Sequence, residues 1–141
     1  SSIPPYPNIF PVQRRRIPLL GEIACGEPIF CNEGRESYVE AGTDVRADFC
    51  LKARGDSMIG ARILDGDIVF IQKDAPLEDG QIYAVAIEDE ATLKRVYYDA
   101  EAGVLQLVAE NPAFKPLIYS GEKLNQVRIL GRAIAFQSDV R

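Results

Sequence analysis

Short apolar runs alternate with turn-forming clusters along most of this chain. From about Ile17 onward the runs are rich in Val, Ile, Tyr and Phe, and clusters of Gly, Asp, Asn and Pro separate them. β-branched and aromatic side chains pack well on a pleated sheet, whereas Gly, Pro, Asn and Asp favour turns. The pattern therefore predicts an all-β fold. The expected strands are Phe49–Ala53, Asp67–Gln72, Gln81–Ile87, Thr92–Tyr97, Val104–Val108 and Val127–Phe136.

Two of these runs are close enough in sequence to form a hairpin. Ile82–Ile87 and Leu93–Tyr97 are joined by the acidic turn Glu88-Asp89-Glu90. A second acidic segment, Asp65-Gly66-Asp67, precedes a strand and is expected to form a turn rather than an acid pair or a metal site. No long amphipathic helix is predicted, although Met58–Leu64 can form one short helical turn.

The beginning of the chain has a different composition. Residues 1–16 hold four of the nine prolines and the basic run Arg14-Arg15-Arg16. Such a segment favours extended conformations and has few side chains to bury. We therefore predict a linker over residues 1–16 and a single domain over residues 17–141. A chain that opens on a linker also leads us to expect a further domain upstream of it.

Charge and hydropathy exclude some classes of function. The net charge of −5 argues against DNA binding by this segment alone, because contact with phosphates needs clustered positive charge. No apolar stretch approaches the roughly 20 residues of a membrane helix, and no secretory signal opens the chain. We expect a cytoplasmic protein that does not contact a membrane.

The cysteines and the missing histidine narrow the chemistry further. Cys25, Cys31 and Cys50 form no CxxC motif, and the chain contains no histidine. Free thiols are therefore expected, with no metal site and no cofactor. Without histidine the chain has neither Ser-His-Asp nor Cys-His catalysis. A hydroxyl nucleophile would need another base, and lysine is the main substitute.

Ser57 and Lys94 are the candidates for such a pair. Ser57 follows an apolar strand in Arg54-Gly55-Asp56-Ser57-Met58, where the glycine lets the backbone turn and expose the hydroxyl. Strand alternation puts Lys94 on one face with Thr92, Val96 and Tyr98. If that face is buried, desolvation lowers the pKa of the lysine and a neutral amine can accept a proton. Taken locally, a surface turn and a solvent-exposed lysine explain the same residues.

Four short blocks of sequence together indicate a particular protein family. They are Gly55-Asp56-Ser57-Met58, Leu64-Asp65-Gly66-Asp67-Ile68-Val69, Thr92-Leu93-Lys94-Arg95 and Glu110-Asn111-Pro112-Ala113-Phe114-Lys115-Pro116. Together they resemble the C-terminal domain family of LexA and lambda repressor, in the family's order and at its approximate separations. The match covers about Ile17 to Ser138. Each block is weak alone, whereas the set of four is specific.

The resemblance implies a fold of coiled antiparallel sheets that carries a Ser–Lys catalytic dyad. By motif matching, Ser57 takes the position of the nucleophile and Lys94 that of the general base. The backbone N–H groups of Asp56 and Ser57 would form the oxyanion hole. The resemblance therefore implies a serine peptidase.

The family's substrate is a loop of its own chain, cut between a small residue and glycine. Here that loop resembles residues 21–28, with the scissile bond at Cys25–Gly26 and with Ile23 and Ala24 flanking it. Glycine after the bond leaves room for attack. Cys25 itself has no histidine partner and is expected to be substrate rather than nucleophile.

The resemblance also implies partners. A homodimer is expected, with an activated RecA–single-stranded DNA filament as co-protease, and DNA would be bound only through an upstream DNA-binding domain. We therefore expect the C-terminal domain of a phage or SOS-type transcriptional repressor, inactivated when its own cleavage separates the two parts.

Other interpretations remain open from the sequence. A UmuD-like accessory protein of a translesion polymerase would share the domain and the self-cleavage, and a helix-turn-helix encoded upstream would favour the repressor instead. A dimerisation and sensing module with a silent dyad is a further alternative. Signal peptidase I shares the dyad chemistry but needs a membrane anchor.

Overall fold

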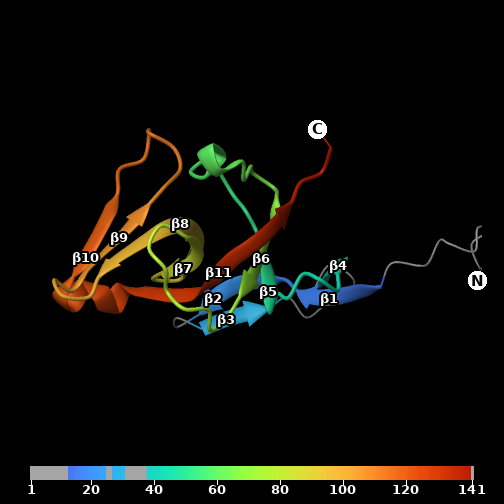
Figure 1. Cartoon of the computed structure of the whole chain (residues 1–141), viewed down its shortest axis with the longest axis horizontal. Coiled ribbons are helices and arrows are strands. Elements are labelled where there is room, and N and C mark those ends of the chain that lie inside the picture. Colours follow the sequence, from blue (N-terminus) through green and yellow to red (C-terminus); the bar gives the residue numbers. More distant parts are fainter. Residues whose placement is uncertain (1–12, 25–26, 31–37, 141) are drawn as a thin grey trace, which may run out of the picture.

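A computed structural model describes residues 13–24, 27–30 and 38–140. Strands dominate this part of the chain, with only short 3-10 turns between them (Figure 1). The elements are β1 (Arg14–Pro18), β2 (Leu20–Ala24), β3 (Glu27–Phe30), β4 (Tyr38–Gly42), β5 (Phe49–Lys52), η2 (Ile59–Ala61), β6 (Ile68–Gln72), β7 (Ile82–Ile87), β8 (Glu90–Asp99), β9 (Val104–Val108), β10 (Leu117–Ser120), η3 (Gly121–Gln126) and β11 (Val127–Gln137). The predicted all-β class of antiparallel sheets is confirmed.

Seven of the described strands form one antiparallel sheet. Its seven strands run in the order β10-β9-β8-β7-β11-β6-β5. The long strand β11 crosses the molecule, with β7 on one side of it and β6 on the other (Figure 1). The predicted hairpin is the β7–β8 pair, in which Ala84 lies opposite Leu93. All six expected strands are present, within a few residues of their predicted ends.

Strand β5, at the end of this sheet, is mostly apolar because both of its faces are covered. In β5, Phe49 packs in one core cluster with Ile23 of β2, whereas Cys50 packs in a second cluster with Ile17 of β1. Successive side chains of a strand point to opposite faces, so each of these residues serves a different layer. The β2–β3 hairpin therefore covers one face of β5, and the β1–β4 pair covers the other.

The small pairs β1–β4 and β2–β3, and the edge strand β10, were not predicted as strands. β1 begins at Arg14 and pairs with β4, so the basic run lies within a strand although we assigned it to the linker. Its three arginines are exposed, and only Ile17 of this strand is fully buried. One buried side chain gives too little apolar alternation for a strand to be recognised from the sequence.

Cys50 is the cysteine that lies within the described residues. It is a free and completely buried thiol, and its Sγ donates to the carbonyl oxygen of Pro18 at 3.5 Å. Burial raises the pKa of this thiol to about 12. The thiol is therefore protonated near neutral pH, as suits a packing role. Cys25 and Cys31 lie outside the described residues.

Gly131 lets β11 pass close to β6. The register of β11 against β7 shifts between Ile129 and Gly131. A Cβ added at Gly131 would lie 2.6 Å from the carbonyl oxygen of Gln72 and 2.6 Å from a methyl carbon of Ile71. Both contacts are shorter than any ordinary packing distance, so the two strands would have to separate locally.

We therefore expect Gly131→Ala to destabilise the domain. Forcing extra atoms into a packed interior costs about 1–3 kcal/mol, and urea denaturation followed by circular dichroism measures that loss. An unchanged midpoint would show that β11 and β6 can move apart without cost.

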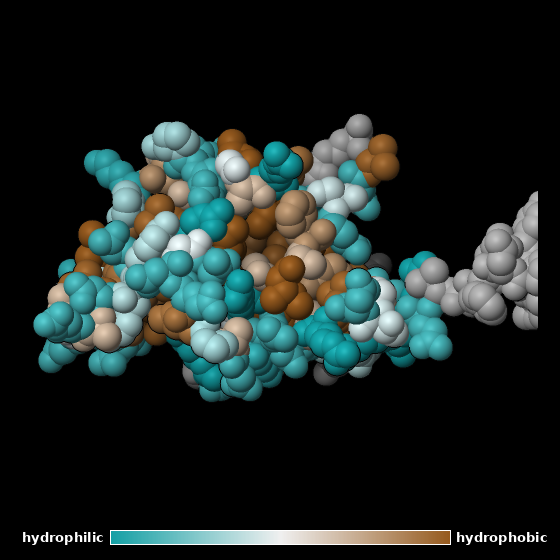
Figure 2. All heavy atoms as spheres, viewed as in Figure 1, coloured by the Kyte–Doolittle hydropathy of each residue, from teal (hydrophilic) through white to brown (hydrophobic). Residues whose placement is uncertain are grey.

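The described part of the chain contains no helix long and apolar enough to cross a membrane. Apolar side chains gather instead in a hollow on one face of the molecule, bordered by hydrophilic residues (Figure 2). The surface elsewhere on this face is mainly hydrophilic.

Candidate active site

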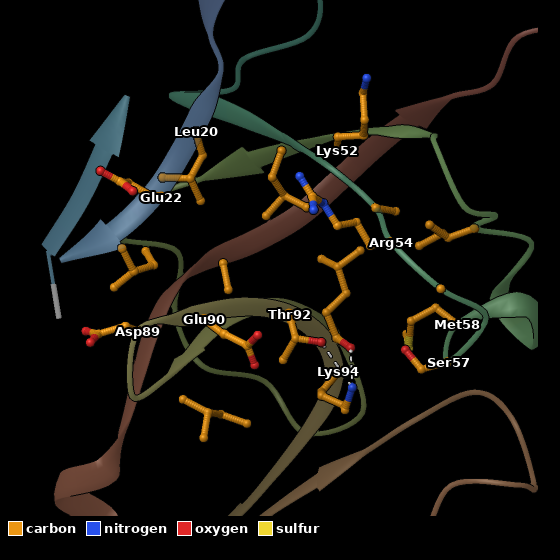
Figure 3. A pocket seen from close by; sticks show the side chains of 18 of the residues that line it. Leu20, Glu22, Lys52, Arg54, Ser57, Met58, Asp89, Glu90, Thr92 and Lys94 are labelled. Carbon is orange, nitrogen blue, oxygen red and sulfur yellow. Dashed lines mark hydrogen bonds between the residues drawn. The ribbon is translucent and has the colours of Figure 1, made fainter. Parts of the chain in front are cut away.

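One cavity of about 550 Å³ brings together segments that are far apart in the sequence. Its walls come from β2, from β5 and the loop that follows it, and from the β7–β8 hairpin. Both Ser57, on the loop after β5, and Lys94, on β8, line it (Figure 3). The apolar side chains of Leu51, Met58 and Ile63 line it as well. The cavity can therefore hold an extended peptide beside a hydroxyl and an amine.

The backbone around Ser57 turns sharply after β5. Gly55 has φ +77°, which a residue with a Cβ adopts only with strain. The chain then passes through Ser57, which is half-buried, and Met58, which is buried and anchors the start of η2. The predicted turn and the predicted short helical turn are both present.

The acidic turn Asp65-Gly66-Asp67 forms hydrogen bonds with the backbone between β5 and Ser57. The N–H of Gly55 donates to Asp65 Oδ1 at 2.8 Å, and the N–H of Ala53 donates to the carbonyl oxygen of Asp67, also at 2.8 Å. The Asp67 side chain is fully buried and accepts from the N–H of Leu64 at 2.8 Å. The segment is thus a turn, as predicted, and it also fixes the backbone just before Ser57.

Lys94 projects from β8 with its amine held by oxygen acceptors. Its Nζ donates to Thr92 Oγ1 at 3.2 Å and to the carbonyl oxygen of Leu93 at 3.2 Å. The side chain is half-buried, and desolvation lowers its pKa below the usual 10.5. Of the face predicted to be buried, Val96 is fully buried, Thr92 is half-buried and Tyr98 is 38% exposed.

This arrangement suits a lysine that acts as a base. A neutral amine has two N–H groups and one lone pair. Thr92 Oγ1 and the Leu93 carbonyl can accept from the two N–H groups, which leaves the lone pair for a proton from another group. Strand alternation already placed Thr92 on the same face as Lys94, and its position two residues before Lys94 accounts for this contact.

Ser57 and Lys94 share the cavity without a bond between them. Among the described residues, no hydrogen bond joins Ser57 Oγ to Lys94 Nζ, and the N–H groups of Asp56 and Ser57 donate to no other described residue. Unused N–H groups beside a hydroxyl can stabilise negative charge that develops on a bound carbonyl oxygen. The cavity therefore presents a hydroxyl and a desolvated amine, and the N–H groups of Asp56 and Ser57 lie next to that hydroxyl in the chain.

The predicted substrate loop borders the same cavity. Gly21, Glu22 and Ile23 of β2 line it, and Ile23 is buried in the core. Ala24 is half-buried and lies opposite Glu27 in the β2–β3 register. The predicted cleavage site, Cys25–Gly26, lies outside the described residues.

Within residues 13–24, 27–30 and 38–140, no group of three or more His, Cys, Asp or Glu side chains is placed to hold a metal ion.

Comparison with known protein families identifies the class of protein to which this β domain belongs. The Peptidase S24-like family matches residues 18–134, and the chain belongs to that family. A LexA repressor of Leptospira interrogans is 40% identical over 128 residues, which is 88% of this chain and 60% of the relative. A LexA repressor of Oleidesulfovibrio alaskensis is 38% identical over 132 residues, 92% of this chain and 62% of the relative.

These similarities confirm the resemblance drawn from the four sequence blocks. The chain is a LexA-like C-terminal peptidase domain. It spans about three-fifths of the length of the relatives described above.

Proposed function

We propose that this domain cuts its own chain between Cys25 and Gly26 by means of a Ser57–Lys94 dyad. One observation carries the proposal: Ser57, Lys94 and the strand that leads to the cleavage site all border a single cavity. The desolvated amine and the family relationship support it. Self-cleavage would then inactivate a transcriptional repressor.

The chemistry of the cut follows from these groups. Neutral Lys94 takes the proton of Ser57, and the serine oxygen attacks the carbonyl carbon of Cys25. The N–H groups of Asp56 and Ser57 stabilise the oxyanion. Lys94 then gives the proton to the nitrogen of Gly26 as the peptide bond breaks. Water hydrolyses the ester between Ser57 and Cys25, which frees the serine and leaves a carboxylate on Cys25.

Substrate and nucleophile belong to one chain, so their approach is intramolecular and each molecule is cut once. Control must then act on how often the cleavage loop occupies the cavity. We propose that a RecA–single-stranded DNA filament favours the occupied state. Such a shift requires the filament to bind that state more tightly than the other.

The rest of the repressor proposal concerns assembly. Residues before β1 would link this domain to an upstream DNA-binding domain, and two copies of the domain would form the homodimer. Ile134 and Phe136 of β11 are 38% and 42% exposed, so they offer apolar surface for such a contact. Separating the two parts would weaken binding to a two-part operator, because the half-sites would no longer be held by one molecule. This activity would take place in the cytoplasm.

Incubation of the purified chain at alkaline pH tests the proposal. We expect intact-mass measurement to show two products, residues 1–25 and residues 26–141, without any added protease. Their rate of formation should not depend on protein concentration, because the reaction is intramolecular. A chain that keeps its full mass, or one cut at another bond, would contradict the proposal.

A further inference from the structure

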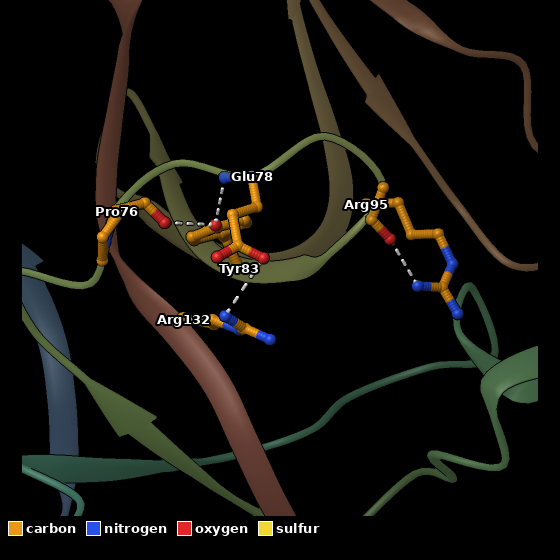
Figure 4. Close-up of polar contacts among 6 residues, drawn as sticks. Pro76, Glu78, Tyr83, Arg95 and Arg132 are labelled. Carbon is orange, nitrogen blue, oxygen red and sulfur yellow. Dashed lines mark hydrogen bonds and ion pairs between the residues drawn. The ribbon is translucent and has the colours of Figure 1, made fainter.

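A chain of side-chain contacts connects the strand that carries Lys94 to the loop that carries Ser57. It begins at Arg95, whose Nε donates to Glu110 Oε1 in an ion pair. The same guanidinium donates through Nη1 to the carbonyl oxygen of Gly80 at 2.6 Å, and Figure 4 shows this bond. The two charged side chains are only 30% and 31% exposed. Arg95 is therefore fixed at two points next to Lys94.

Glu110 and Asn111 then form hydrogen bonds with the loop that contains Ser57. The carbonyl oxygen of Glu110 accepts from the N–H of Gly60 at 2.8 Å. Asn111 Nδ2 donates to the carbonyl oxygen of Asp56 at 2.9 Å. These two bonds hold the loop on both sides of Ser57.

Asn111 is itself held in place. Its Oδ1 accepts from the N–H of Ala113 at 2.9 Å, and its carbonyl oxygen accepts from the N–H of Phe114 at 3.1 Å. This turn fixes the amide so that its Nδ2 faces Asp56. The sequence identified Asn111 only as part of a family motif, so its contact with the nucleophile loop was not predicted.

We infer that Arg95, Glu110 and Asn111 form a brace that positions the Ser57 loop against the Lys94 strand, and that they are positioning residues for self-cleavage. The inference rests on the proposed Ser57–Lys94 function. No backbone pairing links the Ser57 loop to β8 within the described residues, so these contacts supply the link. A misplacement of about 1 Å between reacting groups can cost roughly a hundredfold in rate.

Variants of the two linking residues separate this role from a general effect on folding. Asn111→Asp keeps the acceptor for Ala113 but removes the donor to Asp56. Glu110→Ala removes the partner of Arg95, whereas Glu110→Gln keeps an oxygen that can accept from its Nε. Glu78→Ala is a matched control, because the Arg132–Glu78 ion pair at 3.6 Å joins β11 to the segment before β7 and does not involve the Ser57 loop (Figure 4).

The first readout is the rate of self-cleavage across a pH range. Asn111→Asp and Glu110→Ala should lower the maximal rate by roughly 10- to 100-fold. Each variant also changes the charge near Lys94 by one, so a small shift of the midpoint pH accompanies this loss. Glu110→Gln and Glu78→Ala should cleave within about threefold of the wild-type rate, as expected where no positioning contact is lost. A shifted midpoint with an unchanged maximal rate would overturn the inference, because the contacts would then act on the lysine pKa.

The second readout does not depend on cleavage. Hydrogen exchange in the Ser57→Ala background should show faster exchange of the amides in residues 55–61 for Glu110→Ala and Asn111→Asp, but not for Glu78→Ala. Equal exchange in all three proteins would overturn the brace. Thermal unfolding identifies any variant that has lost the fold, and the mild Asn111→Asp change then decides the outcome.

The two proposals fail in different ways. If wild-type protein cleaves itself and the brace variants cleave equally fast, only the brace is wrong. If wild-type protein never shortens, the proposed function fails and the positioning role fails with it.

Discussion

Ser57→Ala and Lys94→Ala proteins should fold normally and show no self-cleavage at any pH. The first change removes the atom that attacks the Cys25 carbonyl, and the second removes the group that accepts its proton. Loss of either member of a catalytic pair lowers the rate by at least about a thousandfold, since the two act as a unit. Intact-mass measurement over several days at alkaline pH detects even slow conversion.

Matched substitutions at exposed positions control for a general effect of the changes. Ser120 and Lys123 are exposed residues near η3, away from the cavity lining. Ser120→Ala and Lys123→Ala should therefore cleave at the wild-type rate. The double variant Ser57→Ala with Lys94→Ala should be no slower than either single variant. Residual cleavage by either single variant would show that another group supplies the nucleophile or the base.

The rate of self-cleavage should rise steeply with pH and then level off. Below the pKa of Lys94 the amine is protonated and has no lone pair, so only the small neutral fraction reacts. That fraction grows about tenfold for each pH unit until the pKa is reached. Burial lowers this pKa from its usual 10.5, so the levelling should begin below pH 10.5.

Removing one hydrogen-bond acceptor from the Lys94 amine provides a second test of the dependence of the cleavage rate on pH. Thr92→Val removes the hydroxyl that accepts from Lys94 Nζ while it keeps the branched shape. The charged amine needs such acceptors more than the neutral amine does, so this change should move the midpoint to lower pH. A rate that stays flat from neutral to strongly alkaline pH would exclude Lys94 as the base.

Strands with dense apolar sequence could be predicted from the chain, and strands with sparse apolar sequence could not. β5, β6 and β7 are apolar on both faces, and each was found because burial on two sides leaves an unbroken run. β1 contains one fully buried residue, Ile17, and its three exposed arginines leave no apolar alternation that would indicate a strand. Its partner β4 follows a long gap in the sequence, so the pairing depends on contacts that local patterns do not encode.

The candidate site was predictable only where local sequence motifs carry its residues. Ser57 and Lys94 stand in recognisable sequence blocks, and both line one cavity. The supports of these residues were missed, because a carboxylate such as Asp65 bonds an amide ten positions away in the loop. Asn111 reaches Asp56 across a far longer separation. Nothing in the local sequence specifies the partner of such a side chain.

Titration of Lys94 itself is the most direct measurement of the central claim, that a desolvated amine serves as the base for Ser57. The side-chain carbon next to Nζ can be followed by NMR in the Ser57→Ala protein, with Lys94→Arg to assign the signal. We predict a midpoint below 10.5 that coincides with the midpoint of the wild-type cleavage profile. A lysine that titrates at its ordinary value or higher, while cleavage levels off at lower pH, would contradict this account.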